Sequence, residues 1–306
     1  QTRLQTEQFL SRSLRVAGMN DRSSDLALLE AVAARAVRAS GDYLADAFRD
    51  LSIEAEYGTD DVKSAADREA EARALDVIHD AYPDHAVHGE ESGRAGEHRY
   101  EWVVDPLDGT NNFAAGIPSF ATAACVLCDG QPLVSAIYEP LPDSLYLARR
   151  DGGATADGEP LSTESDLSLS QSTVSFVVGL PAVRDDERRA AAERVEAAVD
   201  ARCKRVINTW SPCVDWGLLA RGGIEGLVAF LPDVYEQYAG ELLAAESGVE
   251  SRVLDVDVAA LDDADESTDA ATEHGTTETG VGGLYVAATD RAKLDQLVDA
   301  ASGAIE

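Results

Sequence analysis

The segment WVVDPLDGTNNF, residues 102–113, places Asp105 and Asp108 three residues apart, directly after an apolar run. Two carboxylates this close at the end of a strand repel each other unless a cation lies between them. In proteins Mg²⁺ takes oxygen ligands, usually from a few carboxylates together with the substrate's phosphate. The turn at Pro106 exposes the Leu107 carbonyl, which offers one more oxygen. The spacing therefore predicts a carboxylate site for divalent cations.

Two further groups of acids come earlier in the chain, each at the end of an expected element. Asp67 closes KSAAD, and Glu90 and Glu91 stand in GEES. Taken singly, these motifs have ordinary explanations, because acids and glycine are common in turns and Asp67 could cap its own helix. Taken as an ordered set, they favour one shared metal site.

The residues after the two aspartates favour an anion as the second ligand of this site. Gly109-Thr110-Asn111-Asn112 could begin a helix. The free N–H groups of its first turn would then point at an anion, with the helix dipole in support. Metal-binding carboxylates beside such a helix end predict phosphoryl transfer with two metal ions.

Helical and extended patterns alternate along the chain, which predicts an α/β or α+β fold. Apolar spacing predicts helices over 25–50 and 67–82, and FATAACVLCDGQPLVSAIYEP predicts two strands joined at Asp129-Gly130. We expect a flexible leader at 1–24, an N-terminal α+β subdomain with the metal site at 25–150, and a C-terminal α/β subdomain at 151–306. Residues 255–280 are acidic, Thr-rich and aperiodic, which predicts a solvated or disordered insert.

The charge balance restricts the partners. The 306 residues include 25 basic and 57 acidic ones, a net charge of −32. Such a surface repels nucleic acid and anionic membranes, so we expect neither as a partner. We expect a cytoplasmic, halophilic protein whose repulsion is screened by salt. An acidic pocket for a cationic ligand is the alternative, although the acids are spread along the whole chain.

Cysteine usage also fits a reducing cytosol. There are four cysteines, and Cys125 and Cys128 form an isolated CxxC inside an apolar run that reads as a strand. Side chains i and i+3 of a strand point to opposite faces. We therefore expect free thiols in preference to a zinc site.

The ordered motifs KSAAD, GEES and WVVDPLDGTNNF resemble those of the inositol monophosphatase family, which includes archaeal fructose bisphosphatases and lithium-sensitive sugar and nucleotide phosphatases. The resemblance runs from about residue 25 to the end, apart from the 255–280 insert. It implies a layered αβαβα sandwich and a Mg²⁺-dependent phosphomonoesterase, commonly a homodimer, that acts on a small phosphorylated metabolite.

The resemblance also implies roles for individual residues. Glu90, Asp105 and the Leu107 carbonyl resemble the ligands of the first Mg²⁺ ion. Asp105 is expected to bridge to a second ion that Asp108 also holds, and two or three ions in all are implied.

The same resemblance implies the phosphate and water contacts. Gly109 and Thr110 are expected to supply N–H groups to the phosphate. Asp67 and Thr110 resemble the pair that orients the attacking water.

The chain departs from the family pattern at a second metal ligand. The family has a Trp-Asp pair where this chain has Tyr235 and Glu236, in YEQYAGELLAAESGV. Glu236 keeps the charge but is one methylene longer, and Mg²⁺ demands nearly ideal octahedral geometry. We expect Glu236 to be the ligand, with Asp233 as the possible substitute.

The substrate side departs further. Trp210-Ser211-Pro212-Cys213 stands where family members often have Gly-Ser/Thr-Ala-Ala. We expect Trp210 and Ser211 either to line the substrate pocket or, for the indole, to pack in the core. Trp216 is expected in the core from its position on its helix.

Three functions compete at this point. The first is a Mg²⁺-dependent phosphatase of a small sugar or polyol phosphate, with fructose bisphosphate and inositol phosphate as the leading substrates. The second is a phosphoadenosine-nucleotide phosphatase in which Trp210 stacks on the base. The third is a catalytically weak homologue with a binding or regulatory role, which only the change at Glu236 supports.

Overall fold

The structure is a computed structural model that describes residues 2–50, 55–57, 62–254 and 283–305. Side chains are described for residues 25–50, 65–254 and 283–305. The predicted insert at 255–280 lies outside the described residues, as do the side chains of the predicted leader at 1–24. Helix α1 (Thr2–Arg49) begins well before the start expected at residue 25.

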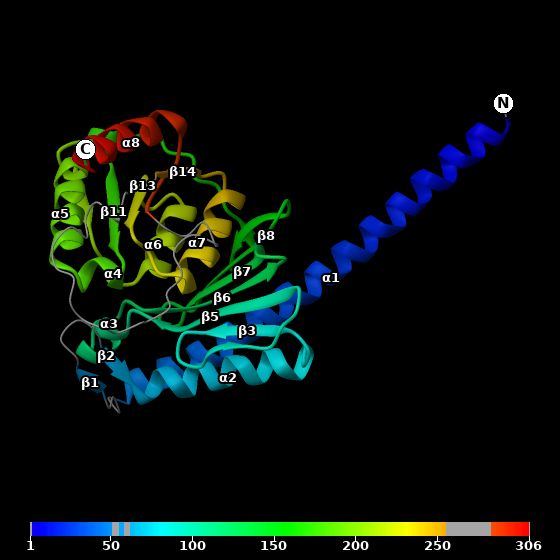
Figure 1. Cartoon of the computed structure of the whole chain (residues 1–306), viewed down its shortest axis with the longest axis horizontal. Coiled ribbons are helices and arrows are strands. Elements are labelled where there is room, and N and C mark those ends of the chain that lie inside the picture. Colours follow the sequence, from blue (N-terminus) through cyan, green and yellow to red (C-terminus); the bar gives the residue numbers. More distant parts are fainter. Residues whose placement is uncertain (1, 51–54, 58–61, 255–282, 306) are drawn as a thin grey trace, which may run out of the picture.

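Five layers of secondary structure make up the molecule (Figure 1). Helices α1 and α2 (Ala65–Ala81) cover one face of a large sheet, and α6 (Pro212–Ala220) and α7 (Val234–Glu246) lie between that sheet and a smaller one. Helices α5 (Asp186–Asp200) and α8 (Arg291–Ile305) cover the far side of the smaller sheet. The expected αβαβα sandwich is confirmed.

The large sheet has the strand order β10-β9-β8-β7-β6-β5-β3-β4. All neighbouring strands in it are antiparallel except β3 and β5, which run parallel. Its strands are β3 (Ala86–Gly89), β4 (Gly93–Ala95), β5 (Tyr100–Asp108), β6 (Ala121–Cys128), β7 (Gln131–Glu139), β8 (Ser144–Arg149), β9 (Gly153–Ala156) and β10 (Glu159–Pro160). Helices cover both faces, which explains the continuous apolar sequence of the central strands.

The turn predicted between β6 and β7 is confirmed. Asp129 and Gly130 both have positive φ, 50° and 76°. This is the type I′ pattern that suits the twist of a hairpin.

The smaller sheet has the order β12-β11-β13-β15-β14. Its parallel strands β11, β12 and β13 are joined by helices, and β15 runs antiparallel to β13 and β14. Its strands are β11 (Thr173–Val178), β12 (Arg205–Ile207), β13 (Gly226–Phe230), β14 (Glu250–Leu254) and β15 (Leu284–Ala288). The remaining described elements are the hairpin β1 (Ala55–Tyr57) and β2 (Val62–Ser64), the short helices α3 (Thr110–Ala115) and α4 (Leu180–Val183), and a 3₁₀ turn (Leu169–Gln171).

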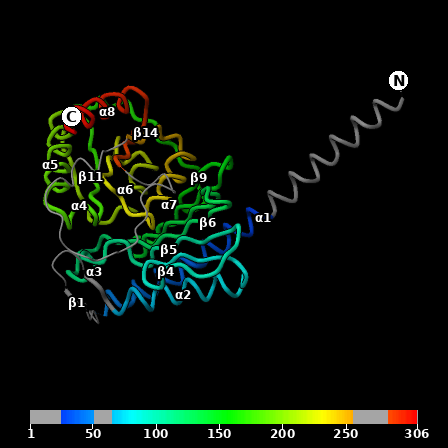
Figure 2. Tube along the Cα trace, viewed as in Figure 1, coloured from blue at the N-terminus to red at the C-terminus, as the bar shows by residue number. Residues whose placement is uncertain are grey.

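Figure 2 traces the path of the chain through the layers. Apolar side chains fill the spaces between these layers. Trp216 of α6 is fully buried between the two sheets, and the prediction that it lies in the core is confirmed. Its indole fills the space beside Gly240 of α7, where a β-carbon would lie 2.2 Å from the ring. Among the described residues, no helix has both the length and the apolarity that crossing a membrane requires.

Candidate active site

Asp105 and Asp108 lie where β5 ends, and an irregular pairing brings them together. Asp105 pairs with Ala123 of β6 and Asp108 with Ala121, so β5 advances three residues while β6 advances two. The extra residue turns side chains three positions apart toward the same side of the sheet. Their carboxylates, with the sulfur of Cys213, form a group whose ligand atoms lie within 4.8 Å of one another. Only 4% and 6% of the two aspartates is exposed.

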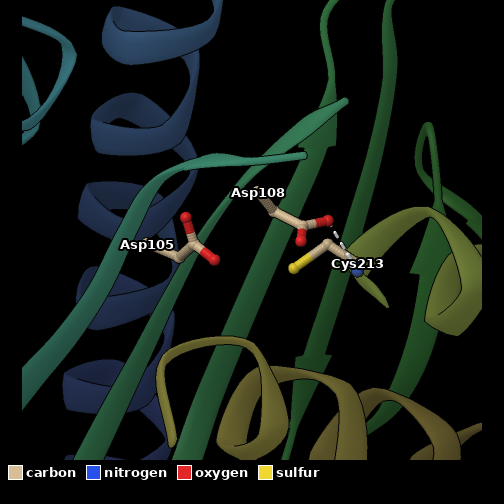
Figure 3. Close-up of side chains that lie close together, drawn as sticks. All are labelled: Asp105, Asp108 and Cys213. Carbon is tan, nitrogen blue, oxygen red and sulfur yellow. Dashed lines mark hydrogen bonds between the residues drawn. The ribbon is translucent and has the colours of Figure 1, made fainter. Parts of the chain in front are cut away.

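Asp108 is fixed from the start of α6. Its Oδ2 accepts hydrogen bonds from Ser211 Oγ at 2.6 Å and from the backbone N–H of Cys213 at 2.8 Å. The second bond is drawn in Figure 3, where the sulfur of Cys213 points toward the two carboxylates. Ser211, a predicted pocket residue, therefore orients a predicted metal ligand from more than 100 residues away in the chain.

The electrostatics of the cluster match a site built for positive charge. Burial, then repulsion from Glu90, Asp108 and Glu236, holds the pKa of Asp105 well above its usual range. Burial raises the pKa of Asp108 to about 7, although its hydrogen bonds to Ser211 and Cys213 act in the opposite direction. The largest influences that raise these pKa values are burial and other carboxylates, and a divalent cation would reverse both. A set of buried carboxylate oxygens that raise one another's pKa values fits a divalent metal ion.

Glu236 joins the cluster from the first turn of α7. It is buried, and burial followed by repulsion from Asp233 and Asp108 raises its pKa well above the usual range. Its Oε1 accepts the backbone N–H of Asp233 at 3.2 Å in a capping box, in which Asp233 is the N-cap. Asp233 Oδ2 accepts the N–H of Leu180 at 3.3 Å. The helix start therefore engages Asp233 and directs Glu236 toward Asp105 and Asp108.

Glu90 follows β3, and its backbone N–H donates to the Val104 carbonyl of β5 at 3.3 Å. Burial of its carboxyl and repulsion from Asp67 and other acids raise its pKa to about 8, although the residue as a whole keeps exposed surface at the rim of the site. The charge of Glu90 also raises the pKa of Asp105, which indicates that Glu90 lies at the same cluster.

The loop that carries Glu90 is anchored by Glu71, a residue that the sequence analysis missed. Glu71 lies one helical turn after Asp67 in α2 and is 3% exposed. Its two carboxylate oxygens accept the backbone N–H groups of Glu91 and Ser92, each at 2.9 Å. The available signal was an acid four positions after Asp67 on an otherwise apolar helix face.

Asp67 and Thr110 are brought together as expected. Thr110 Oγ1 lies 3.1 Å from Asp67 Oδ1 and 3.0 Å from the Leu107 carbonyl, so its one hydroxyl proton can be donated to either oxygen. Asp67 is buried in the first turn of α2. The pair lies directly beside the end of β5 that carries Asp105 and Asp108.

A helix begins at Thr110, as predicted, but it is only six residues long. Gly109 precedes it with a φ of 90°, in the left-handed region that favours glycine. A β-carbon there would lie 3.1 Å from the Ser119 carbonyl and from Ser211 Oγ. Nδ2 of Asn112 joins this turn to the neighbouring loop by donating to the Ser119 and Thr209 carbonyls at 2.8 and 2.7 Å.

Trp210 lies on the outside of the site and not in the core. Half of it is exposed, and its φ of 56° is unusual for a bulky residue. Its neighbours Thr209 and Ser211 contact Asn112 and Asp108 respectively, so the indole stands on a loop that is fixed to the site. The core-packing alternative for Trp210 is therefore wrong.

Tyr235, in the place of the family's tryptophan, contacts the strand that leads to Glu90. Its hydroxyl lies 3.3 Å from Nε2 of His88. Burial, then the charges of Glu90 and Asp233, raises the pKa of Tyr235 to about 12. Tyr235 therefore places an uncharged side chain beside the acidic cluster.

The comparisons with known proteins agree on one family. A model of the inositol monophosphatase family matches residues 25–290. The chain is 31% identical over 220 residues to a fructose-1,6-bisphosphatase/inositol-1-monophosphatase of Aquifex aeolicus, and 30% identical over 223 residues to Nus factor SuhB of Escherichia coli K12. Each match covers 71% of this chain and 82% of the relative. An inositol monophosphatase structure from Anabaena shares the fold, with a TM-score of 0.71 and 23% identity over 92% of this chain and 98% of the other.

Proposed function

Because the chain belongs to the inositol monophosphatase family, we propose that it is a Mg²⁺-dependent phosphomonoesterase of a small sugar or polyol phosphate, with fructose bisphosphate and inositol phosphate as the leading substrates. The relative of Aquifex aeolicus is named for both activities. The observation that carries the proposal is the convergence of the buried carboxylates of Asp105 and Asp108 at the end of β5, with the charge of Glu236 from α7 interacting with both. Buried acids that raise one another's pKa values are costly to fold unless a cation compensates them.

The metal ligands that we propose are Glu90, Asp105 and the Leu107 carbonyl for one ion, and Asp105, Asp108 and Glu236 for a second. The contacts of Asp108 with Ser211 and Cys213 leave its other carboxylate oxygen, Oδ1, for a metal. Glu236 is among the charges that raise the pKa of Asp105, which supports Glu236 as the ligand in preference to Asp233. When bound, divalent ions would stabilise charge on the attacking and leaving oxygens.

The residues around the cluster would position the reactants. Gly109 and Thr110 lie at the turn into α3, and their N–H groups would bind the phosphate. Asp67 would accept a hydrogen bond from the attacking water, and finally its proton, while Thr110 holds the Asp67 carboxylate in place. The water oxygen attacks phosphorus as the ester P–O bond breaks, and the leaving alkoxide takes a proton from solvent.

The test is phosphate release in molar KCl with Mg²⁺, measured on fructose bisphosphate, inositol phosphate, glycerol phosphate and phosphoadenosine phosphate. Wild type is compared with Asp108→Asn, and with Asp129→Asn as the control, because Asp129 lies on an exposed turn and Asn tolerates its positive φ. We expect Mg²⁺-dependent turnover of one sugar or polyol phosphate, abolished by Asp108→Asn only. Turnover that is independent of metal, or unaffected by Asp108→Asn, would exclude the proposed site.

Two alternatives are separated by the same panel. Exposed Trp210 beside the site favours a phosphoadenosine nucleotide as the second substrate candidate, since an indole can stack on a base. A binding or regulatory homologue is the other, since several relatives carry the name Nus factor SuhB. If the chain is such a binding or regulatory homologue, the wild type turns over no substrate of the panel. Activity in Glu236→Asp would then indicate that the change from aspartate to glutamate had impaired the second metal position.

We further propose a cytoplasmic homodimer adapted to high salt, which takes a small phosphorylated metabolite and neither nucleic acid nor membrane. The net charge of −32 supports the salt requirement and opposes binding to anionic polymers. Unfolding and sedimentation measured from dilute buffer to molar KCl test both points. Full folding and activity without salt would contradict the halophilic assignment.

A further inference from the structure

Cys213 brings a sulfur atom to a cluster otherwise made of oxygens. We propose that Sγ of Cys213 is a ligand of the cation held by Asp105 and Asp108, so that this position prefers a thiophilic divalent ion such as Co²⁺, Zn²⁺ or Cd²⁺ over Mg²⁺. The inference rests on the proposed function, because it uses the second metal position assigned there.

The first support is geometric. Sγ of Cys213 and one oxygen from each of Asp105 and Asp108 lie within 4.8 Å of one another, and all three residues are buried. A zinc-type ion lies about 2.0–2.2 Å from a carboxylate oxygen and about 2.3 Å from a thiolate. In a tetrahedral site such donors are separated by about 3.4–3.6 Å. The three atoms already lie within 4.8 Å of one another, so small side-chain rotations would bring them onto one ion.

The second support is that the position of the sulfur is fixed by the backbone. Cys213 follows Pro212 at the start of α6, and its N–H donates to Asp108 at 2.8 Å. The same bond therefore orients a carboxylate ligand and holds the thiol beside it (Figure 3). Burial and the charges of Asp108, Asp105 and Glu236 hold the pKa of this thiol well above its ordinary value, so the thiol is protonated until a cation displaces the proton.

The other described thiols lack this environment. Cys125 lies among apolar side chains of β6, and Cys203 is half-buried near the end of α5, with its thiol 3.9 Å from the Asp200 carbonyl. Cys128 has one carboxylate beside it, that of Asp129 at 3.7 Å, but it also accepts from the cationic Arg99 at 3.2 Å. The placement of Cys213 among carboxylates is thus a property of its position in the fold.

The chemistry distinguishes metals sharply. Mg²⁺ is a hard ion that binds oxygen in octahedral geometry, whereas thiolate ligands favour softer ions. On binding, a bond forms between the metal and Sγ, and the S–H proton leaves to solvent, with no oxidation or reduction. A mixed oxygen and sulfur site also tolerates the longer Glu236 side chain, because the softer ions accept lower coordination numbers than Mg²⁺ does.

The experiment is a Co²⁺ titration of the full chain, freed of metal by chelation and kept in molar KCl. Binding through sulfur gives a near-ultraviolet charge-transfer absorption in addition to the weaker visible bands of Co²⁺. Wild type is compared with Cys213→Ser, Cys213→Ala and the control Cys203→Ser. Calorimetry gives the ratio of Cd²⁺ to Mg²⁺ affinity for each protein, and circular dichroism verifies folding.

We expect the charge-transfer band in wild type and Cys203→Ser and its loss in both Cys213 variants. The Cd²⁺ to Mg²⁺ affinity ratio should fall at least about tenfold in Cys213→Ser, the order of effect that a ligand environment has on metal affinity. The inference would be overturned if wild type showed the visible Co²⁺ bands without charge transfer, or if wild type and Cys213→Ser had equal ratios of Cd²⁺ to Mg²⁺ affinity. Either result would leave the phosphatase proposal intact. If Co²⁺ and Mg²⁺ both fail to bind, the metal site itself is refuted, and the proposed function falls with it.

Discussion

Replacing Glu71 by glutamine should weaken the site without touching a proposed metal ligand. Glu71 accepts two backbone N–H groups, from Glu91 and Ser92, at 2.9 Å each. Glutamine keeps one acceptor oxygen and turns an NH₂ group toward the other N–H. One hydrogen bond to a carboxylate is lost, and one backbone donor is left facing another donor.

The magnitude follows from these two contacts. A hydrogen bond to a charged group contributes roughly 1.5–3 kcal/mol, and an unsatisfied buried donor costs roughly 1–3 kcal/mol. Glu71 is 3% exposed, whereas Glu91 is half-buried and Ser92 is exposed, so water can replace part of the lost interaction. The two energies describe the same loss, so we expect Glu71→Gln to lower the free energy of unfolding by about 1–3 kcal/mol. If the loop instead opens locally, the Mg²⁺ concentration for half-maximal activity should rise by roughly 10–100-fold, because Glu90 is carried by this loop.

Glu69→Gln is the matched control. Glu69 lies two residues earlier on the same helix, is exposed, and pairs with Arg73 on the surface. An exposed pair of this kind is worth only about 0.3–0.5 kcal/mol. Denaturant unfolding and Mg²⁺ titration of activity are measured for both variants in molar KCl. If Glu71→Gln matches Glu69→Gln in both measurements, the anchoring role of Glu71 is wrong.

Two further predictions concern a turn and a histidine. Gly109→Ala should destabilise the protein more than Gly116→Ala. Both glycines have positive φ, which costs an L-residue about 1–2 kcal/mol, but of the two only Gly109 is crowded, with contacts at 3.1 Å. Equal losses of unfolding free energy in denaturant would contradict this. Burial and the neighbouring His98 lower the pKa of His85 in the folded protein. The neutral imidazole therefore contributes stability that is fully present above the unfolded-state pKa of about 6.5. This contribution is lost as the pH falls from that value toward the lower pKa of the folded state. The thermal midpoint of wild type should therefore fall more than that of His85→Gln between about pH 7.5 and about pH 5.5, and parallel curves would refute it. The groups that face His85 are Tyr82, Asp84, His98, Tyr100 and Trp102.

Local patterns in the chain predicted the elements well. The turn at Asp129-Gly130, the helix that begins at Thr110 and the burial of Trp216 depend on residues close in sequence or on one helix face, and the structure confirms each. The five-layer order came from the family resemblance, because apolar periodicity says which face of a helix is buried but not against which sheet.

The sequence predicted the site only where several of its residues stand together in one short segment. DPLDGT carries two acids, a turn and a helix start within six residues, so its chemistry could be inferred directly. Glu71 offered only its position four residues after Asp67 on an otherwise apolar helix face, and its role could not be assigned until its two N–H partners were known. Trp210 stayed ambiguous for a similar reason, since an indole near a site fits a core as well as a pocket until its exposure is known.

The sequence by itself determined the acids, their order and the strand and helix ends that carry them, because these depend on interactions between near neighbours in the chain. Only the tertiary structure decided what surrounds those acids. The irregular pairing of β5 with β6 turns Asp105 and Asp108 to one side, and α6 brings Ser211 and Cys213 from about 100 residues away. Burial and charge repulsion depend on every group within a few ångströms, whatever its distance along the chain. For this reason only the folded structure shows that the sulfur of Cys213 lies among the carboxylates.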